Sequence, residues 1–166
     1  MDTLLVNDLI GILDEEANIY EEVLNISKDK KDIIIAGKVT DLEKLVKVEQ
    51  TLILKISGLE LKREQLVDKL SAQIRADSNE ITVSELLKHL EGEQAAALRK
   101  RQEKIIDVIN ELRNTNALNS KLIKNSLDFI NFSMNLIASF DVNDNNYGNN
   151  GQSNDSKKRN LFDIKL

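Results

Sequence analysis

The chain has 166 residues, of which 31% are charged and 4% aromatic, and it holds six glycines but no proline, cysteine or tryptophan. Compact α/β and all-β domains of this size need prolines and several glycines for their turns, so this composition favours long helices with few connections. The net charge of −5 weighs against nonspecific binding to nucleic acid, and the lack of cysteine excludes disulfides and thiol chemistry.

The start of the sequence and its hydropathy argue against secretion and membrane insertion. Met1-Asp2-Thr3-Leu4 lacks the basic region that opens a signal peptide. No apolar run approaches the ~20 residues that a helix needs to cross a bilayer. We therefore expect a cytoplasmic protein with no direct membrane insertion.

The first expected helix runs from Asp2 to about Ile35. Its apolar residues form two neighbouring stripes in steps of three and four residues, which is typical of the broad apolar face of a bundle helix. Glu16 and Lys30 interrupt the first stripe. The helix is expected to end at Ala36-Gly37-Lys38, because glycine readily takes the left-handed conformation of a C-terminal cap.

The second expected helix starts at Thr40, where Thr40 to Glu43 has the pattern of a capping box. A seam of residues in strict steps of three and four follows, apolar at seven of nine places: Leu42, Leu45, Glu49, Leu52, Ile56, Leu59, Arg63, Leu66 and Leu70. Such spacing is typical of a coiled coil. Gly58 lies inside this helix, where it either permits the close approach of another helix or is neutral.

A short helix and a long one are expected in the second half. Thr82 to Glu85 forms another capping box, which predicts a short helix to about Leu90, and Gly92 indicates a corner. One long helix is expected from Glu93 to Phe140. After Phe140 the residues are mostly Asn, Asp, Gly, Ser and Lys, which is typical of a disordered tail.

Together these elements predict an all-α fold. We expect an elongated antiparallel helical bundle, or coiled coil, of three long helices plus one short helix. The expected domains are a helical bundle over residues 1–140 and a flexible C-terminal tail over residues 141–166.

No residue pattern indicates catalysis or a metal site. His89 is the only histidine and has no HExxH partner, so a structural role at or near the surface is favoured. The acidic residues 14–16 and 21–22 are interpreted as a solvated helix face, because consecutive carboxylates on a helix point in different directions. The basic residues 99–101 lack interleaved aromatics and are interpreted in the same way. We expect no enzyme, no cofactor and no bound metal.

The end of the long helix carries more apolar residues than one contact face needs. Ten of its last 19 residues are large and apolar, and we call them the apolar end: Leu122, Ile123, Leu127, Phe129, Ile130, Phe132, Met134, Leu136, Ile137 and Phe140. At about 100° per residue they surround most of the helix, which predicts an exposed apolar patch. A groove for a partner's amphipathic helix is one interpretation. Coverage by the short helix or by a dimer partner is the other.

Small polar residues precede the apolar end, on or beside the seam of the long helix. Asn116 and Asn119 lie on the seam itself. A buried asparagine fixes the register of packed helices at some cost in stability. Exposure of these residues at an end of the bundle is the alternative.

Five segments occur in a distinctive order along the chain. They are Leu13-Asp14-Glu15-Glu16, Ala36-Gly37 ahead of Asp41-Leu42-Glu43-Lys44-Leu45, the stretch from Asn119 to Phe132, Tyr147-Gly148-Asn149-Asn150-Gly151, and Leu161-Phe162-Asp163-Ile164-Lys165. In this order they resemble the FlgN-type flagellar export chaperones, which escort hook–filament junction proteins to the type III export apparatus. The similarity covers nearly the whole chain.

The resemblance implies what the chain binds. The apolar end would hold an aggregation-prone helical end of a hook-associated (junction) protein and prevent its premature assembly. Tyr147 would dock on the cytoplasmic domain of the export gate. A self-associating structural coiled coil without cargo is the alternative, which leaves a homodimer open. A membrane-surface helix is disfavoured, because residues 122–140 have only Lys124 and Asp128 as charges.

Overall fold

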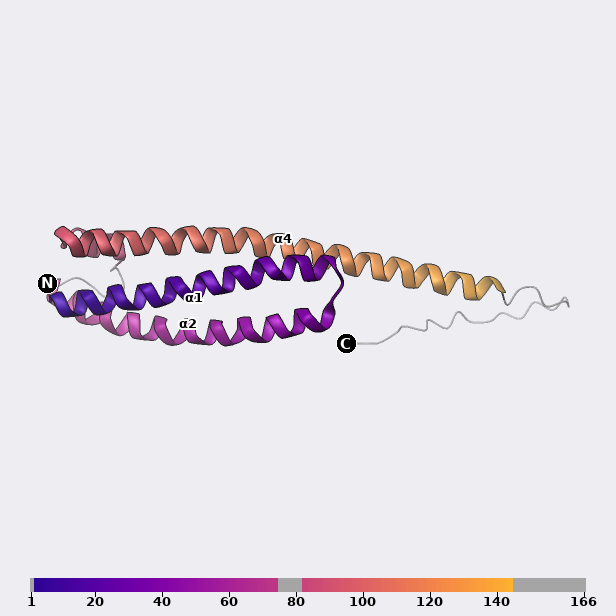
Figure 1. Cartoon of the computed structure of the whole chain (residues 1–166), viewed down its shortest axis with the longest axis horizontal. Coiled ribbons are helices and arrows are strands. Elements are labelled where there is room, and N and C mark those ends of the chain that lie inside the picture. The colour runs from indigo at the N-terminus through magenta and orange to yellow at the C-terminus, as the bar shows by residue number, and fades with distance from the viewer. Residues whose placement is uncertain (1, 75–81, 145–166) are drawn as a thin grey trace. The chain divides into compact units, whose positions relative to one another are not determined.

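The computed structural model describes residues 2–74 and 82–144, and within them every regular element is a helix (Figure 1). The helices are α1 (Thr3–Ile35), α2 (Val39–Ile74), α3 (Val83–Leu87) and α4 (Gly92–Asp144). The expected all-α fold of three long helices and one short helix is therefore confirmed. α4 continues past Phe140, and the rest of the predicted tail lies outside the described residues.

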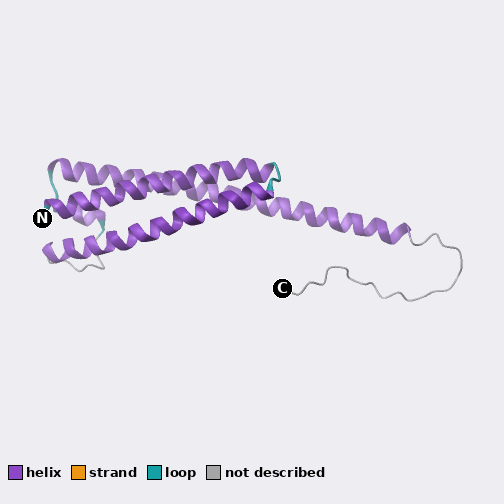
Figure 2. Ribbon diagram, turned by 60° about the horizontal axis from the view of Figure 1, so that its bottom comes forward, coloured by secondary structure: helices purple, strands orange, loops and turns teal. Residues whose placement is uncertain are grey.

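The chain divides into two compact units, residues 1–126 and 127–166. In the first unit α1, α2 and the early part of α4 lie side by side (Figures 1 and 2). α2 runs antiparallel to α1, since Glu16 pairs with Arg63 whereas Lys30 pairs with Glu49. α4 runs parallel to α1, so the three helices follow the expected up-down-up course.

The ends of α1 follow from its flanking residues. At the start, the Asp2 carboxylate accepts a hydrogen bond from the Leu4 amide at 2.9 Å. At the end, Gly37 has φ +66°, and the amides of Gly37 and Lys38 donate to the carbonyls of Ile34 and Ile33 at 3.1 Å. This is a Schellman motif, which satisfies carbonyls that the helix end leaves open. The predicted glycine cap is confirmed.

Two predicted helix boundaries are wrong in detail. α2 begins at Val39, and the Lys38 carbonyl already accepts the Leu42 amide at 3.0 Å, so Thr40 lies inside the helix and does not cap it. α3 ends at Leu87 rather than near Leu90. Its predicted cap is present, because Thr82 Oγ1 accepts the Glu85 amide at 3.2 Å. Gly92, the first residue of α4, has φ +67° and makes the expected corner there.

The core of the first unit consists of two clusters of aliphatic residues. The larger lies toward the start of α1 and joins all four helices through Val6, Leu9, Leu13, Leu70, Leu86 and Leu98. Leu86 of α3 is 1% exposed, so the short helix closes this end of the core. The smaller cluster joins Val23 of α1 to Leu52 and Ile56 of α2, with Leu112 of α4 packed against it.

Two ion pairs lie in the seam between α1 and α2. Glu16 Oε1 lies 3.2 Å from Arg63 Nε, and Lys30 Nζ lies 2.7 Å from Glu49 Oε1. These residues interrupt the apolar series of the sequence, and the two pairs are separated by equal lengths of α1 and α2. A slip of one helix along the other would break both pairs, so they fix the register.

Glu16 is buried, with 4% of the residue exposed. Burial raises the pKa of Glu16 above its ordinary 4.5, the neighbouring Arg63 charge and hydrogen bond oppose this rise, and the Glu60 charge adds to it. The folded chain therefore holds the Glu16 proton more tightly than the unfolded chain does.

The raised pKa makes a prediction about stability and pH. Above about pH 4.5, the folded state binds more protons at Glu16 than the unfolded state does. The contribution of Glu16 to the free energy of unfolding therefore falls as pH rises through the folded pKa. Glu16→Gln removes the titration. We expect Glu16→Gln to gain stability relative to the wild type as pH rises from about 4 to about 7, measured by urea unfolding.

Glu64→Gln, at an exposed position of α2, is the matched control and should show no such trend. A Glu16→Gln difference that stays constant with pH, or that changes in the opposite direction, would contradict a destabilising burial of this carboxylate.

Candidate functional site

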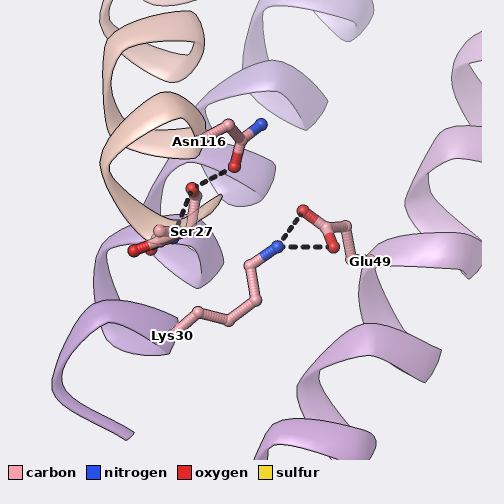
Figure 3. A network of polar contacts seen from close by, with 5 residues as sticks. Ser27, Lys30, Glu49 and Asn116 are labelled. Carbon is pink, nitrogen blue, oxygen red and sulfur yellow. Dashed lines mark hydrogen bonds and ion pairs between the residues drawn. The ribbon is translucent and has the colours of Figure 1, made fainter. Parts of the chain in front are cut away.

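A polar cluster joins α1 to α4 near the end of the first unit (Figure 3). Ser27 is fully buried, and its hydroxyl donates to Asn116 Oδ1 at 2.6 Å. Asn119 is 5% exposed, and its Nδ2 donates to the Ser27 carbonyl at 2.7 Å. Both asparagines thus contact the same serine. This confirms burial in the α1–α4 contact for Asn119, whereas Asn116 is only partly buried there.

Further ion pairs join the acidic face of α1 to basic residues of α4. Both carboxylate oxygens of Asp14 accept from Arg101 at 2.9 and 3.0 Å, and Glu21 lies 3.1 Å from Lys104. The expectation of a purely solvated acidic face is therefore wrong, most clearly for the buried Glu16. Such partly exposed pairs contribute little stability each, but they orient α4 parallel to α1.

The side chains of α4 become more exposed after Asn119. Among the α4 side chains described, which end at Ser139, Asn119 is the last one that is buried. Leu122 is partly buried, Ile123 is exposed, and every member of the apolar end from Leu127 to Ile137 is exposed. Phe129 is 70% exposed and Phe132 63%. The side chain of Phe140 lies outside the described residues. The apolar patch expected from the sequence is thus present from Leu127 to Ile137.

The apolar end is arranged in two stripes along α4. One contains Ile123, Leu127, Ile130, Met134 and Ile137, and the other contains Leu122, Phe129, Phe132 and Leu136. Ser126 and Ser133 lie between them. At about 100° per residue the stripes together occupy roughly 220° of the circumference. One packed helix needs a face of about 100°, so this surface has room for two helices.

The opposite side of this part of α4 is polar. It carries Lys124, Asp128, Asn131 and Asn135, all exposed. The two charges have opposite signs. Recognition through the apolar end would therefore depend on shape and hydrophobic burial, with little electrostatic steering.

The short helix α3 packs through Leu86 into the cluster that contains Leu70 and Leu98. This contact lies within the first unit, whereas the side chains from Leu127 to Ile137 belong to the second. Coverage of the apolar end by α3 or by a second copy of the chain stays a prediction.

Other candidate sites have less support. His89 is exposed just after α3. Within residues 2–74 and 82–144, no group of three His, Asp or Glu side chains is placed to hold a metal ion. Over the same residues, no helix is both long and apolar enough to cross a membrane. Tyr147, the predicted docking residue, lies outside the described part of the chain.

Comparison with known protein families decides the assignment, because a model of the FlgN protein family matches residues 1–155. The chain belongs to the FlgN family of flagellar export chaperones. This is a chaperone family and not an enzyme family. The match includes all four helices and Tyr147, whereas the terminal Leu161-Phe162-Asp163 lies beyond it.

The chain is also similar to a protein of Bacillus subtilis (strain 168) with the name "Uncharacterized protein YvyG". The two are 27% identical over 149 residues, which cover 89% of this chain and 90% of the relative. No solved structure matches the chain at a significant level.

The polar cluster of α1 and α4 makes a second prediction. Ser27→Ala removes the hydroxyl that donates to Asn116, and so leaves a partly buried acceptor without its partner. We expect a loss of about 1–3 kcal/mol in the free energy of unfolding, measured by urea denaturation.

Ser120→Ala, at an exposed position of α4, is the control and should change stability by less than about 0.5 kcal/mol. Equal effects of the two substitutions would show that the Ser27 hydroxyl does not hold α4 to α1.

Proposed function

We propose that this chaperone binds terminal helical segments of hook-associated (hook–filament junction) proteins through the apolar end of α4. In the cytoplasm it keeps these cargo segments from assembling prematurely, and it delivers the cargo to the export gate. The observation that carries the proposal is the run of exposed large apolar side chains from Leu127 to Ile137. Family membership supplies the class of cargo.

Burial of the apolar end supplies the driving force for binding. Each square ångström of apolar surface removed from water contributes roughly 25 cal/mol, and soluble monomers rarely leave a large contiguous apolar patch exposed. A helix with apolar residues at steps of three and four is the shape that another amphipathic helix fits. The two stripes suit a cargo that presents two helices or one helical hairpin.

The composition of the surface supports a chaperone that accepts related cargo helices. Met134 lies in the middle of one stripe, and its unbranched side chain adapts to partners of different shape. Lys124 and Asp128 are the only charges between residues 122 and 140. A membrane surface is the poorer partner, because it selects helices with a strongly basic polar face.

Delivery is assigned to Tyr147. The proposal rests on the Tyr147-Gly148-Asn149-Asn150-Gly151 segment and on the family match, which extends to residue 155. We propose that Tyr147 docks on the cytoplasmic domain of the export gate, separately from the surface that binds cargo.

The cargo site is tested by co-purification with the terminal helical segments of hook-associated proteins. Phe129→Asp and Leu136→Asp each place a charge within the apolar end. We expect each to weaken cargo binding by about tenfold or more, because a buried unpaired charge costs several kcal/mol. Both positions are exposed in the free chain, so helix content and unfolding temperature should stay at the wild-type values.

Asn135→Asp is the matched control, since it adds the same charge to the polar side of the same helix segment. It should bind cargo as the wild type does. If cargo binding is absent, or survives Phe129→Asp and Leu136→Asp in folded protein, the cargo site is not the apolar end. If these variants instead dissociate a wild-type dimer, the self-associating coiled coil is the correct function.

The tail is tested separately by removing residues 145–166 and by Tyr147→Ala. Both changes should leave cargo binding intact and weaken binding to the cytoplasmic domain of the export gate. Loss of cargo binding on truncation would place the cargo site in the tail.

A further inference from the structure

The outward side of α2 carries apolar residues that are not buried against the other packed helices. Leu54 and Leu61 are 74% and 58% exposed. They are two turns apart on one side of α2, whereas the buried Leu52, Ile56 and Leu59 face the core on the other. In Figure 1, α2 lies along one edge of the three packed helices.

Ser57 and Gly58 lie between these two leucines and have small or no side chains. A Cβ atom added at Gly58 would meet nothing within 4 Å, so packing within the described chain does not require a glycine there. Glycine in the interior of a helix weakens that helix. The close approach of another backbone at this point would give Gly58 a structural role.

On this face, exposed residues at equal distances before and after the point between Ser57 and Gly58 are complementary to each other. When a second α2 is laid antiparallel with its centre at the same point, four kinds of pairs form: Ser57 with Gly58, Leu54 with Leu61, Gln50 with Gln65, and Lys47 with Asp68. Small residues meet at the centre, leucines flank them, amides follow, and opposite charges close the two ends.

The charges at the ends of this face have no other partner among the described residues. None of the ion pairs in residues 2–74 and 82–139 uses Lys47 or Asp68. In a two-fold arrangement Lys47 of each copy would meet Asp68 of the other, so this ion pair would form twice over the same interface. No charge of this face would be opposed by a like charge.

We propose that two copies of this chain associate through the outward faces of α2, antiparallel, with the two-fold axis beside Ser57 and Gly58. The contact spans residues 47–68, about 33 Å at 1.5 Å per residue. A single pair of helices of this length buries less surface than a standard stable interface, so the dimer is weak and depends on concentration. The interface uses no residue of α4 and does not rest on cargo binding.

Sedimentation equilibrium of the full chain tests the association. From about 10 µM to about 1 mM, the weight-average mass should rise from 18.8 kDa toward twice that value. Leu54→Glu and Leu61→Glu should each raise the dissociation constant about tenfold or more. Leu4→Glu, at a position of α1 that is 73% exposed, is the matched control and should leave it unchanged.

A wild-type mass that stays at 18.8 kDa over this range overturns the proposal. Equal effects of Leu4→Glu and Leu54→Glu overturn it as well, because the contact then does not lie on α2. Unchanged cargo binding in the α2 variants is expected, so failure of the dimer and failure of the cargo site give different results.

Charge reversal distinguishes a second copy from any other occupant of the face. Lys47→Glu alone and Asp68→Lys alone should weaken the dimer, and the double variant should restore it, because the pair reforms in reverse. A double variant as weak as the single ones overturns the antiparallel register.

The chain has no cysteine, so introduced cysteines report the contact directly. Ser57→Cys should form a disulfide-linked dimer under mild oxidation, and Ser120→Cys should not. Equal crosslinking of the two variants overturns the placement of the two-fold axis.

Discussion

The contact of Ser27 with Asn116 and Asn119 fixes the register of α4 against α1. A seam of aliphatic residues tolerates a slip of one heptad, because the same kinds of side chains meet again. A polar pair in the seam does not, because a slip leaves buried hydrogen-bonding groups without partners. α4, with 53 residues, is longer than α1 with 33 and α2 with 36. The polar cluster lies in the first unit, and the exposed apolar side chains from Leu127 to Ile137 lie in the second.

Register between α1 and α2 depends on the same principle, with charges in place of amides. Glu16 with Arg63 and Lys30 with Glu49 occupy positions that leucine would fill at less cost in desolvation. The burial of Glu16 reduces stability, and so does the buried Asn119 Oδ1, which accepts no hydrogen bond from residues 2–74 or 82–144. We infer that the polar groups in these helix contacts lower the stability of the fold and in return specify a single alignment of its helices.

Sequence patterns predicted the helices well and their partners less well. Gly37 and Gly92 mark real helix ends, because a left-handed residue strongly favours glycine. Thr40 was misleading, since a capping-box pattern also fits inside a helix whose first turn starts earlier. The interruptions at Glu16 and Arg63 pair with each other, which periodicity within one helix does not show. The exposed apolar end was predictable because its residues exceed one face, whereas the residues that touch a cargo depend on the partner's shape.

We propose that the apolar end of α4 binds a helix of the cargo. Hydrogen exchange along α4, measured for the free chain and with a terminal helical segment of a hook-associated protein, tests it most directly. In the free chain, amides of residues 127–139 should exchange faster than those up to Asn119, because no side chain of that segment is buried. Bound cargo should slow exchange over residues 122–139. Slowed exchange elsewhere in the chain, with residues 122–139 unchanged, would contradict the account.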